Sequence, residues 1–206
     1  MEGNEPKKVT DLPKGVIDYG WSPDGKSLAV CGDVDPEEAV ASVGTEGVPQ
    51  VTVVQRVRYR YDTLGWRGDA HFHLFVVNLD RDETRQLTDG DWDDTAPVWS
   101  PDGSQIAFIS GRRDDRDFLA LSEVYTVPAE GGEPKLVSEG LLSVGALTWS
   151  PDGRQLAVVG SDAPEGMVLW QGWLYVLEDG KEPQKLTDDT IKPYLGFPPV
   201  MRPATL

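Results

Sequence analysis

The chain has 206 residues, of which 19 are basic and 35 acidic, so its formal net charge at pH 7 is −16. A chain this acidic is repelled by phosphate backbones and anionic lipids, which argues against binding to nucleic acid or to a membrane surface. The hydrophobic fraction is only 39%, but seven Trp, six Tyr and five Phe favour a folded core over disorder.

The amino-terminal residues and the cysteine content bear on the compartment. The opening MEGNEPKKVT has no apolar segment, and no run in the chain approaches the ~20 apolar residues that span a bilayer. We therefore expect a cytoplasmic protein if Met1 is the natural start, whereas a removed signal peptide would cancel that expectation. Cys31 is the single cysteine, which excludes an internal disulfide. Its apolar neighbours predict a buried, inert thiol.

A pentapeptide recurs three times along the chain. It is Trp-Ser-Pro-Asp-Gly, at residues 21–25, 99–103 and 149–153, and an apolar run follows each copy. A second β-rich block then begins at His73, Glu123 and Trp173. Equivalent positions of the two blocks are 25 residues apart in the later copies but 53 apart in the first. The first repeat therefore carries an insertion of 28 residues.

Each repeat predicts four antiparallel strands. Ser-Pro-Asp-Gly is a reverse turn, because Pro presets φ, Asp caps the turn and Gly accepts a positive φ. The Asp-Gly and Gly-Gly pairs of the second block indicate another hairpin. Four-stranded units repeating at about 40–50 residues are typical of β-propeller blades. A β-sandwich is the alternative, but it gives no reason for the pentapeptide to recur in register.

The predicted fold is all-β, a partial β-propeller of about three four-stranded antiparallel blades. Blade 1 is expected at about 11–90 with the insertion at 33–70, blade 2 at about 91–140 and blade 3 at about 141–190. Residues 191–206 are the start of a further blade or a tail. Closed propellers have about four to eight blades. We therefore expect either a fragment of a larger ring or a homo-oligomer whose copies complete one.

The repeats resemble those of TolB-like propellers and of the propeller domains in the prolyl oligopeptidase family of serine peptidases. The first repeat narrows the resemblance to the acylaminoacyl-peptidase branch. Its motifs there are Arg-Val-Arg-Tyr-Arg-Tyr-Asp at 56–62, His-Leu-Phe-Val-Val at 73–77 and Arg-Gln-Leu-Thr-Asp-Gly at 85–90, followed by the pentapeptide and 106–113. The resemblance covers most of residues 10–190.

In that family an N-terminal propeller covers an α/β-hydrolase domain that holds a Ser–Asp–His triad, and it filters substrates to short or unfolded peptides. The resemblance therefore implies a non-catalytic propeller segment that gates peptides. It also implies that the segment docks on an α/β-hydrolase catalytic domain of the same parent chain. The alternative is a stand-alone TolB-like propeller acting as a protein-interaction module. A third possibility is a carbohydrate-processing propeller similar to the oligogalacturonate lyases. That reaction usually needs a metal with several histidine ligands, so a chain with only two histidines fits it poorly.

The sequence contains no catalytic motif of its own. A hydrolase nucleophile needs Gly-x-Ser-x-Gly, and the segments 20–25 and 140–145 have the wrong spacing. Pro23 also follows Ser22 directly and removes a backbone N–H that an oxyanion hole would use. Only two histidines are available, His71 and His73. We therefore predict no catalytic residue, and no motif indicates a cofactor.

The insertion holds the candidate contact residues. Arg56, Arg58 and Arg60 alternate with apolar and aromatic residues, so we expect three guanidiniums on one face. They would hold a peptide carboxylate or a partner domain, or else pair with nearby Asp and Glu. Trp66, His71 and His73 complete the predicted substrate- or partner-contact set.

The two histidines and the acidic clusters bear on metal binding. His71 and His73 lie two apart on one strand face, a spacing compatible with metal ligation, and Asp69 could add a third ligand. The alternative is a pair of solvated histidines. The acidic clusters at 33–38, 89–94 and 114–117 do not fit the EF-hand loop. No metal site is therefore predicted.

Overall fold

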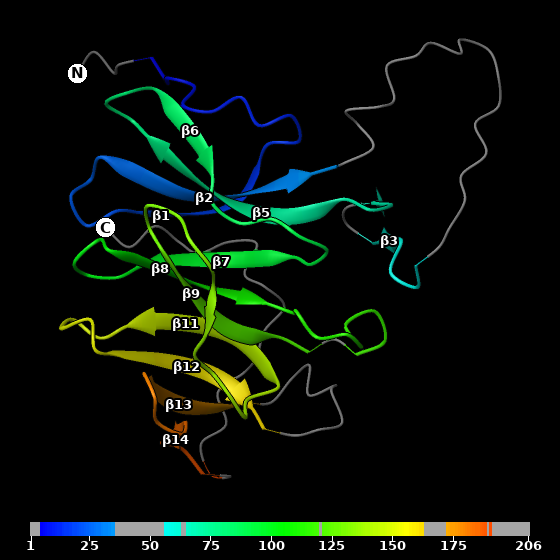
Figure 1. The fold of residues 1–206 in the computed structure, drawn as a ribbon, viewed down its shortest axis with the longest axis vertical. Coiled ribbons are helices and arrows are strands. Elements are labelled where there is room, and N and C mark those ends of the chain that lie inside the picture. The colour runs from blue at the N-terminus through cyan, green and yellow to red at the C-terminus, as the bar shows by residue number, and fades with distance from the viewer. Residues whose placement is uncertain are drawn as a thin grey trace.

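The computed structural model describes residues 5–35, 56–62, 65–119, 121–162, 172–188 and 190. Within these ranges the strands form three four-stranded antiparallel sheets and one two-stranded hairpin. The sheets follow one another along the long axis of the molecule (Figure 1). The prediction of an all-β partial propeller with about three blades is therefore confirmed.

The strands of each blade pair in sequence order, although in blade 1 the β3–β4 hairpin comes between the second and third strands. Blade 1 consists of β1 (Val16–Trp21), β2 (Ser27–Val34), β5 (His71–Asn78) and β6 (Glu83–Gln86). Blade 2 consists of β7 (Asp94–Trp99), β8 (Gln105–Ser110), β9 (Glu123–Pro128) and β10 (Lys135–Leu136). Blade 3 consists of β11 (Ser143–Trp149), β12 (Gln155–Ser161), β13 (Trp173–Glu178) and β14 (Gln184–Lys185).

The inserted segment is only partly described. Residues 36–55, 63 and 64 of the insertion lie outside the described ranges, as does the stretch 191–206. The described part contains the hairpin of β3 (Arg60–Tyr61) and β4 (Gly65–Trp66), which lies beside the blades rather than in one of them (Figure 1). Among the described residues there is no helix with the length and apolarity needed to cross a bilayer.

The Ser-Pro-Asp-Gly turn has the same hydrogen bonds in every blade. In blade 2, Ser100 Oγ donates to Asp102 Oδ1 over 2.6 Å, and the same hydroxyl accepts the N–H of Gln105 at 3.0 Å. Gly103 has a φ of 73°, a conformation open to Gly at little cost. The serine and aspartate of the other two copies repeat the bond at 2.7 and 2.6 Å. The turn is therefore specified locally, by its own side chains.

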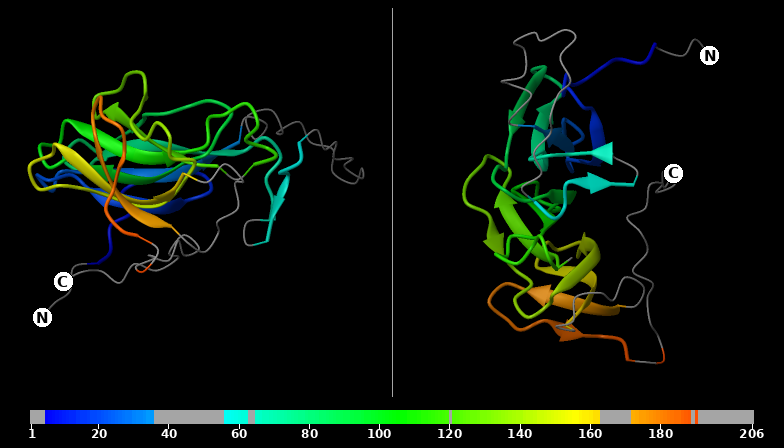
Figure 2. Two further views of the ribbon diagram at one scale, coloured as in Figure 1. Left: turned by 90° about the horizontal axis from the view of Figure 1, so that it is seen from below. Right: turned by 90° about the vertical axis from the view of Figure 1, so that its right-hand side faces the viewer.

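The middle blade buries both of its faces, which explains its continuous apolar run. On β8, Ile106 and Phe108 join the core cluster shared with blade 1, while Ala107 and Ile109 join the cluster shared with blade 3. Successive side chains of a strand point to opposite faces, so one run of apolar residues serves both interfaces. The three sheets stack face to face (Figure 2).

A tryptophan of each later blade bonds to the blade before it. Trp99 Nε1 donates to the carbonyl of Gly20 and Trp149 Nε1 to the carbonyl of Val98, each over 3.1 Å. The strands approach closely there, because a Cβ on Gly20 would lie 2.9 Å from the Pro97 carbonyl oxygen. The first strands β1, β7 and β11 therefore lie next to one another across the blades.

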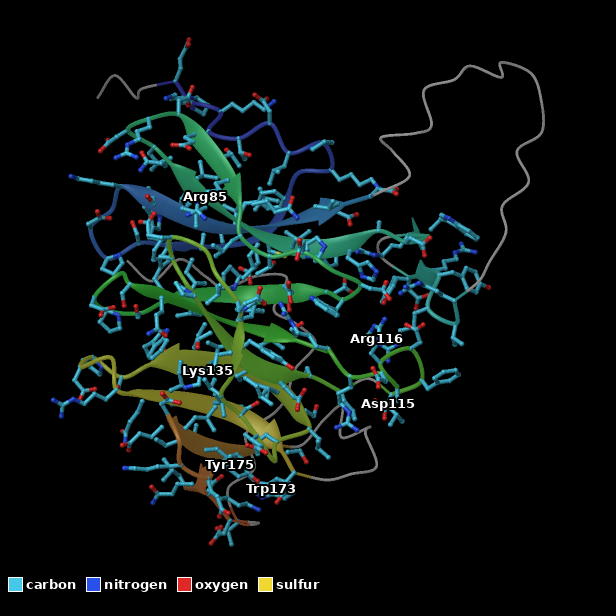
Figure 3. The ribbon with its side chains drawn as sticks, in the orientation of Figure 1. Arg85, Asp115, Arg116, Lys135, Trp173 and Tyr175 are labelled. Carbon is cyan, nitrogen blue, oxygen red and sulfur yellow. The ribbon has the colours of Figure 1, made fainter. Side chains whose placement is uncertain are left out.

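The outer edges of the blades are tied as well. Arg85 Nη2 of β6 donates to the Ala129 carbonyl at the start of the β9–β10 turn over 2.7 Å. Lys135 of β10 forms an ion pair with Asp179 in the β13–β14 turn. Arg85 and Lys135 are labelled in Figure 3. Both contacts join one blade to the next, so the blades are linked at the outer edge as well as at the first strands.

Antiparallel pairing separates two kinds of connection. The pentapeptide turns and the turns before β6, β10 and β14 lie at one end of the blades, because the paired strands alternate in direction. The connections β2–β5, β6–β7, β8–β9 and β10–β11 lie at the opposite end, which we call the loop end. All the candidate contact residues come from this end or from the β3–β4 hairpin.

Candidate functional site

A pocket of about 250 Å³ opens at the loop end. Its lining comes from three stretches of chain, within residues 56–71, 91–95 and 109–122. These are the inserted segment of blade 1, the connection between blades 1 and 2, and the end of β8 with the loop that follows it. The pocket therefore forms where two blades meet, and binding sites in rigid scaffolds are commonly carried by such loops.

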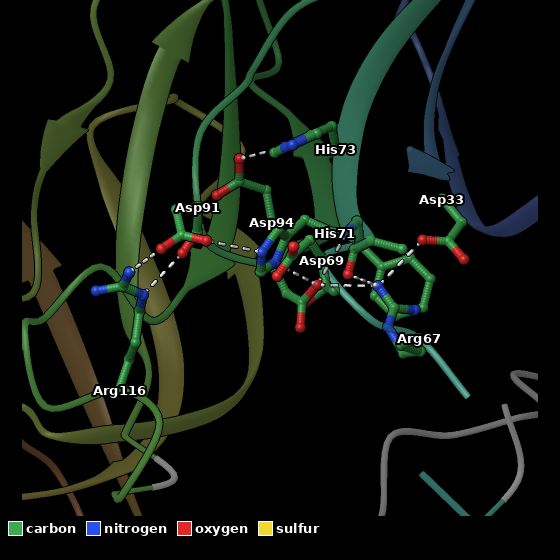
Figure 4. A network of polar contacts seen from close by, with 12 residues as sticks. Asp33, Arg67, Asp69, His71, His73, Asp91, Asp94 and Arg116 are labelled. Carbon is green, nitrogen blue, oxygen red and sulfur yellow. Dashed lines mark hydrogen bonds and ion pairs between the residues drawn. The ribbon is translucent and has the colours of Figure 1, made fainter. Parts of the chain in front are cut away.

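Asp91 is the centre of the charged network beside the pocket. It accepts hydrogen bonds from the guanidiniums of Arg56 and Arg116, and His71 Nε2 lies 3.0 Å from its Oδ1 (Figure 4). Burial favours a higher pKa for Asp91, but the two guanidiniums outweigh burial and hold the pKa below its usual value. Asp91 is therefore ionised at neutral pH, and it joins three segments that are distant in sequence.

Arg56 is paired with local carboxylates. Besides Asp91, its Nε lies 3.1 Å from Asp69 Oδ1 and its Nη1 lies 4.0 Å from Asp117 Oδ1. Arg56 therefore follows the alternative given in the sequence analysis, in which an arginine of the insertion pairs with Asp side chains of the protein itself. Arg58 also lines the pocket, but within the described residues it makes no ion pair or hydrogen bond.

Arg60 and Trp66 lie on the hairpin, outside the pocket lining. They face each other as a β3–β4 pair, and the Trp66 ring lies 5.3 Å from that of Tyr59. Trp66 is 48% exposed. Of the three predicted arginines, Arg56 is therefore paired with carboxylates, Arg58 lies in the pocket wall without a partner among the described residues, and Arg60 lies outside the pocket lining.

Arg67 holds the inserted segment against the blade. Its side chain is 4% exposed, and Nη2 lies 3.1 Å from Asp33 Oδ1 and 3.3 Å from Asp93 Oδ1. The guanidinium carbon also lies 3.8 Å from the centre of the Phe72 ring, a cation–π distance. A buried charge of this kind must be paired, and two carboxylates supply the pairing.

The two histidines have different surroundings. His71 lies between two aspartates, Asp91 and Asp93, with Nδ1 3.5 Å from Asp93 Oδ1. His73 is buried, and its Nδ1 lies 3.6 Å from Oδ2 of the fully buried Asp94. The ring centres are 6.4 Å apart. The described residues contain no group of three or more His, Cys, Asp or Glu side chains arranged to hold a metal ion.

Several residues of the site were not singled out in the sequence. Arg67, Asp91 and Arg116 carry the ion pairs, and Trp92 forms part of the pocket wall. The acidic clusters at 89–94 and 114–117 contain three of these residues, Asp91, Trp92 and Arg116, but those clusters were compared only with the EF-hand calcium loop. A second signal for these residues in the sequence is the arginine-rich insertion, because its arginines need carboxylate partners elsewhere in the fold.

Comparisons with known proteins agree with this architecture, although no family model matches the chain. YuxL, an uncharacterized peptidase of Bacillus subtilis, is 33% identical over 130 residues, which is 60% of this chain and 19% of YuxL. The chain therefore spans about a fifth of that relative. The Pyrococcus horikoshii acylaminoacyl peptidase has 19% identity and a TM-score of 0.60, covering 85% of this chain and 26% of the peptidase.

TolB from Acinetobacter baumannii also matches, with 16% identity and a TM-score of 0.51 over 87% of this chain and 34% of TolB. At identities this low, the likeness to these solved structures shows the fold alone. The chain is a partial β-propeller similar to TolB-like propellers and to the propeller domains of acylaminoacyl peptidases.

Proposed function

We propose that this chain is a non-catalytic N-terminal propeller segment of a serine peptidase, which gates peptide substrates and docks on an α/β-hydrolase domain of the same parent chain. The similarity to the Bacillus peptidase over 130 residues is the observation that carries the proposal. The absence of Gly-x-Ser-x-Gly in the 206 residues supports a binding role for this part. The pocket at the loop end is where peptides would be held.

The second candidate is a stand-alone TolB-like propeller that acts as a protein-interaction module. Its support is the likeness of fold to TolB over most of the chain. The coding sequence on both sides of these 206 codons separates the two candidates. A downstream continuation into a domain with a Gly-x-Ser-x-Gly segment is expected for the peptidase. A stop codon directly after Leu206 would contradict it and leave the interaction module.

Docking of another blade is part of the proposal. The first strand of blade 1 exposes Ile17 (47%), Tyr19 (64%) and Trp21 (58%). Trp99 and Trp149 occupy the equivalent position of their repeats and bond to a preceding blade. A further blade, from the parent chain or from a second copy, would cover this face and accept the Trp21 N–H.

Gating is tested on the full-length protein. Hydrolysis of a short chromogenic peptide and of a folded protein is compared before and after deletion of the propeller part. The intact enzyme should cleave the short peptide and spare the folded protein, and the deletion variant should lose that discrimination. Equal discrimination by both would contradict gating. If the deletion variant does not fold, a second variant takes its place, namely the full-length protein with a disulfide that fixes two neighbouring blades together.

A further inference from the structure

We propose that the loop-end pocket binds the C-terminal carboxylate of a peptide, with Arg58 as the cation that receives it. The inference rests on the proposed peptide-binding function and names the part of the peptide that is recognised. A guanidinium offers two parallel N–H donors that match the two oxygens of a carboxylate. Arg58 lies in the pocket wall, where it supplies these donors to an incoming ligand.

The charge of the pocket wall favours an anion. Four arginines and three aspartates line it, in a protein whose net charge is −16. Arg56 and Arg116 are occupied by Asp91, and Arg67 is occupied by Asp33 and Asp93. Arg58 is the lining arginine without a carboxylate partner in the described part of the chain. An anionic group of the ligand would supply the missing counter-charge.

The same contacts weigh against a peptide amino terminus. A cationic group would need a free carboxylate in the wall, and the three lining aspartates are engaged. Asp91 accepts from two arginines, Asp93 accepts the Phe72 N–H at 2.8 Å, and Asp117 lies 4.0 Å from Arg56. Recruiting any of them would break an existing ion pair or hydrogen bond. The α-carboxylate of a peptide needs no such exchange.

The size and apolar walls of the pocket add a preference for the last residue. Tyr61, Ala70, Ile109 and Leu121 line the space together with the Trp92 ring. Trp92 is held in place, because a Cβ on Gly90 would lie 2.4 Å from its ring and Arg112 lies 4.8 Å from the ring centre. A volume of about 250 Å³ is at the small end for ligand pockets. It suits one apolar terminal residue rather than a folded segment.

The test compares two forms of one ligand. An N-acetylated tripeptide ending in leucine is titrated into the 206-residue chain as the free acid and as the C-terminal amide, with calorimetry at low salt. The free acid should bind at least about tenfold more tightly, as expected for a charge-assisted pair. Arg58→Gln should weaken the free acid to the level of the amide. Arg60→Gln, two residues away and outside the pocket lining, should leave both affinities unchanged.

The possible outcomes distinguish failure of the carboxylate inference from failure of the peptide-binding function. If acid and amide bind equally well, or if Arg58→Gln leaves the acid unaffected, the carboxylate inference is wrong while peptide binding stands. If neither form binds, the peptide-binding function fails together with the inference. If sodium acetate binds as tightly as the free acid, the pocket takes any carboxylate, and recognition of the terminal residue is overturned.

Discussion

The indole hydrogen bonds between blades give a prediction with an internal control. Trp149→Phe removes the donor that bonds the Val98 carbonyl at 3.1 Å, and Trp99→Phe removes the equivalent bond to Gly20. A net hydrogen bond contributes about 0.5–1.5 kcal/mol, and the smaller ring also loses part of its packing. We therefore expect each variant to lower the free energy of unfolding by about 1–2 kcal/mol.

Trp21→Phe is the matched control. Trp21 occupies the same repeat position, but it is 58% exposed and its indole N–H has no hydrogen bond to any described residue. In the monomeric chain its replacement should change stability by less than about 0.5 kcal/mol, as for other surface substitutions. The contrast between the three variants therefore isolates the contact between blades from the chemistry of replacing an indole.

The assay is thermal unfolding followed by circular dichroism, with the monomer verified by sedimentation. For a domain of this size about 1 kcal/mol corresponds to roughly 2–4 °C in Tm, so Trp99→Phe and Trp149→Phe should each lower Tm by about 2–8 °C. The reasoning is refuted if Trp21→Phe in the monomer costs as much as the other two. It is also refuted if Trp149→Phe costs nothing.

Three further predictions follow from buried or hydrogen-bonded groups. Cys31 is fully buried and burial raises the pKa of its thiol, so Ellman's reagent should leave it unmodified until denaturant is added; rapid reaction of the native chain would contradict this. Hydrogen bonds, the largest from Ser100 and others from the N–H and hydroxyl of Ser104, lower the pKa of Asp102 to about 2, and Ser100→Ala should move the NMR titration midpoint of Asp102 part of the way up toward 3.8. Burial of Asp93 favours a higher pKa, but the adjacent His71 ring, the hydrogen bond from the Phe72 N–H and the charge of Arg67 hold the pKa below its usual value. A carboxyl with a lowered pKa stabilises the fold above its unfolded-state value of about 3.9, and that contribution is lost as the pH falls through the folded-state pKa. Urea unfolding between about pH 5 and 2 should therefore show a smaller loss of stability on acidification in Asp93→Asn than in the parent, and equal slopes would argue against it.

Much of the blade architecture follows from local sequence. The pentapeptide forms its turn through its own serine, aspartate and glycine, so the contacts within Ser100–Gln105 need no distant partner. The apolar runs after each turn identify the strands that are covered on both faces, as β8 is between blades 1 and 3. These features depend on neighbours a few residues apart. They are therefore readable from one sequence.

Other features of the strands depend on the neighbouring blade. The register shifts once within each first strand, between Val16 and Asp18 in β1 and between Thr95 and Val98 in β7. Ala96 adopts a φ of 54° at the second of these shifts. No Gly or Pro pattern common to the three strands marks the position. The shift in β7 contains Pro97, whose carbonyl oxygen lies close to Gly20 of β1, a contact that the pentapeptide alone does not specify.

The repeat, the turns, the three four-stranded blades of the partial propeller and the stretch of chain that carries the arginines all follow from local sequence. Which of those arginines are engaged follows from the tertiary structure instead. Arg56 meets Asp91 across 35 positions of sequence, and Arg116 meets the same carboxylate from a different blade. Such pairs form because the stacking of two blades brings their loop-end connections together. Ion pairing depends on distance in space, and periodicity along the chain carries no information about it.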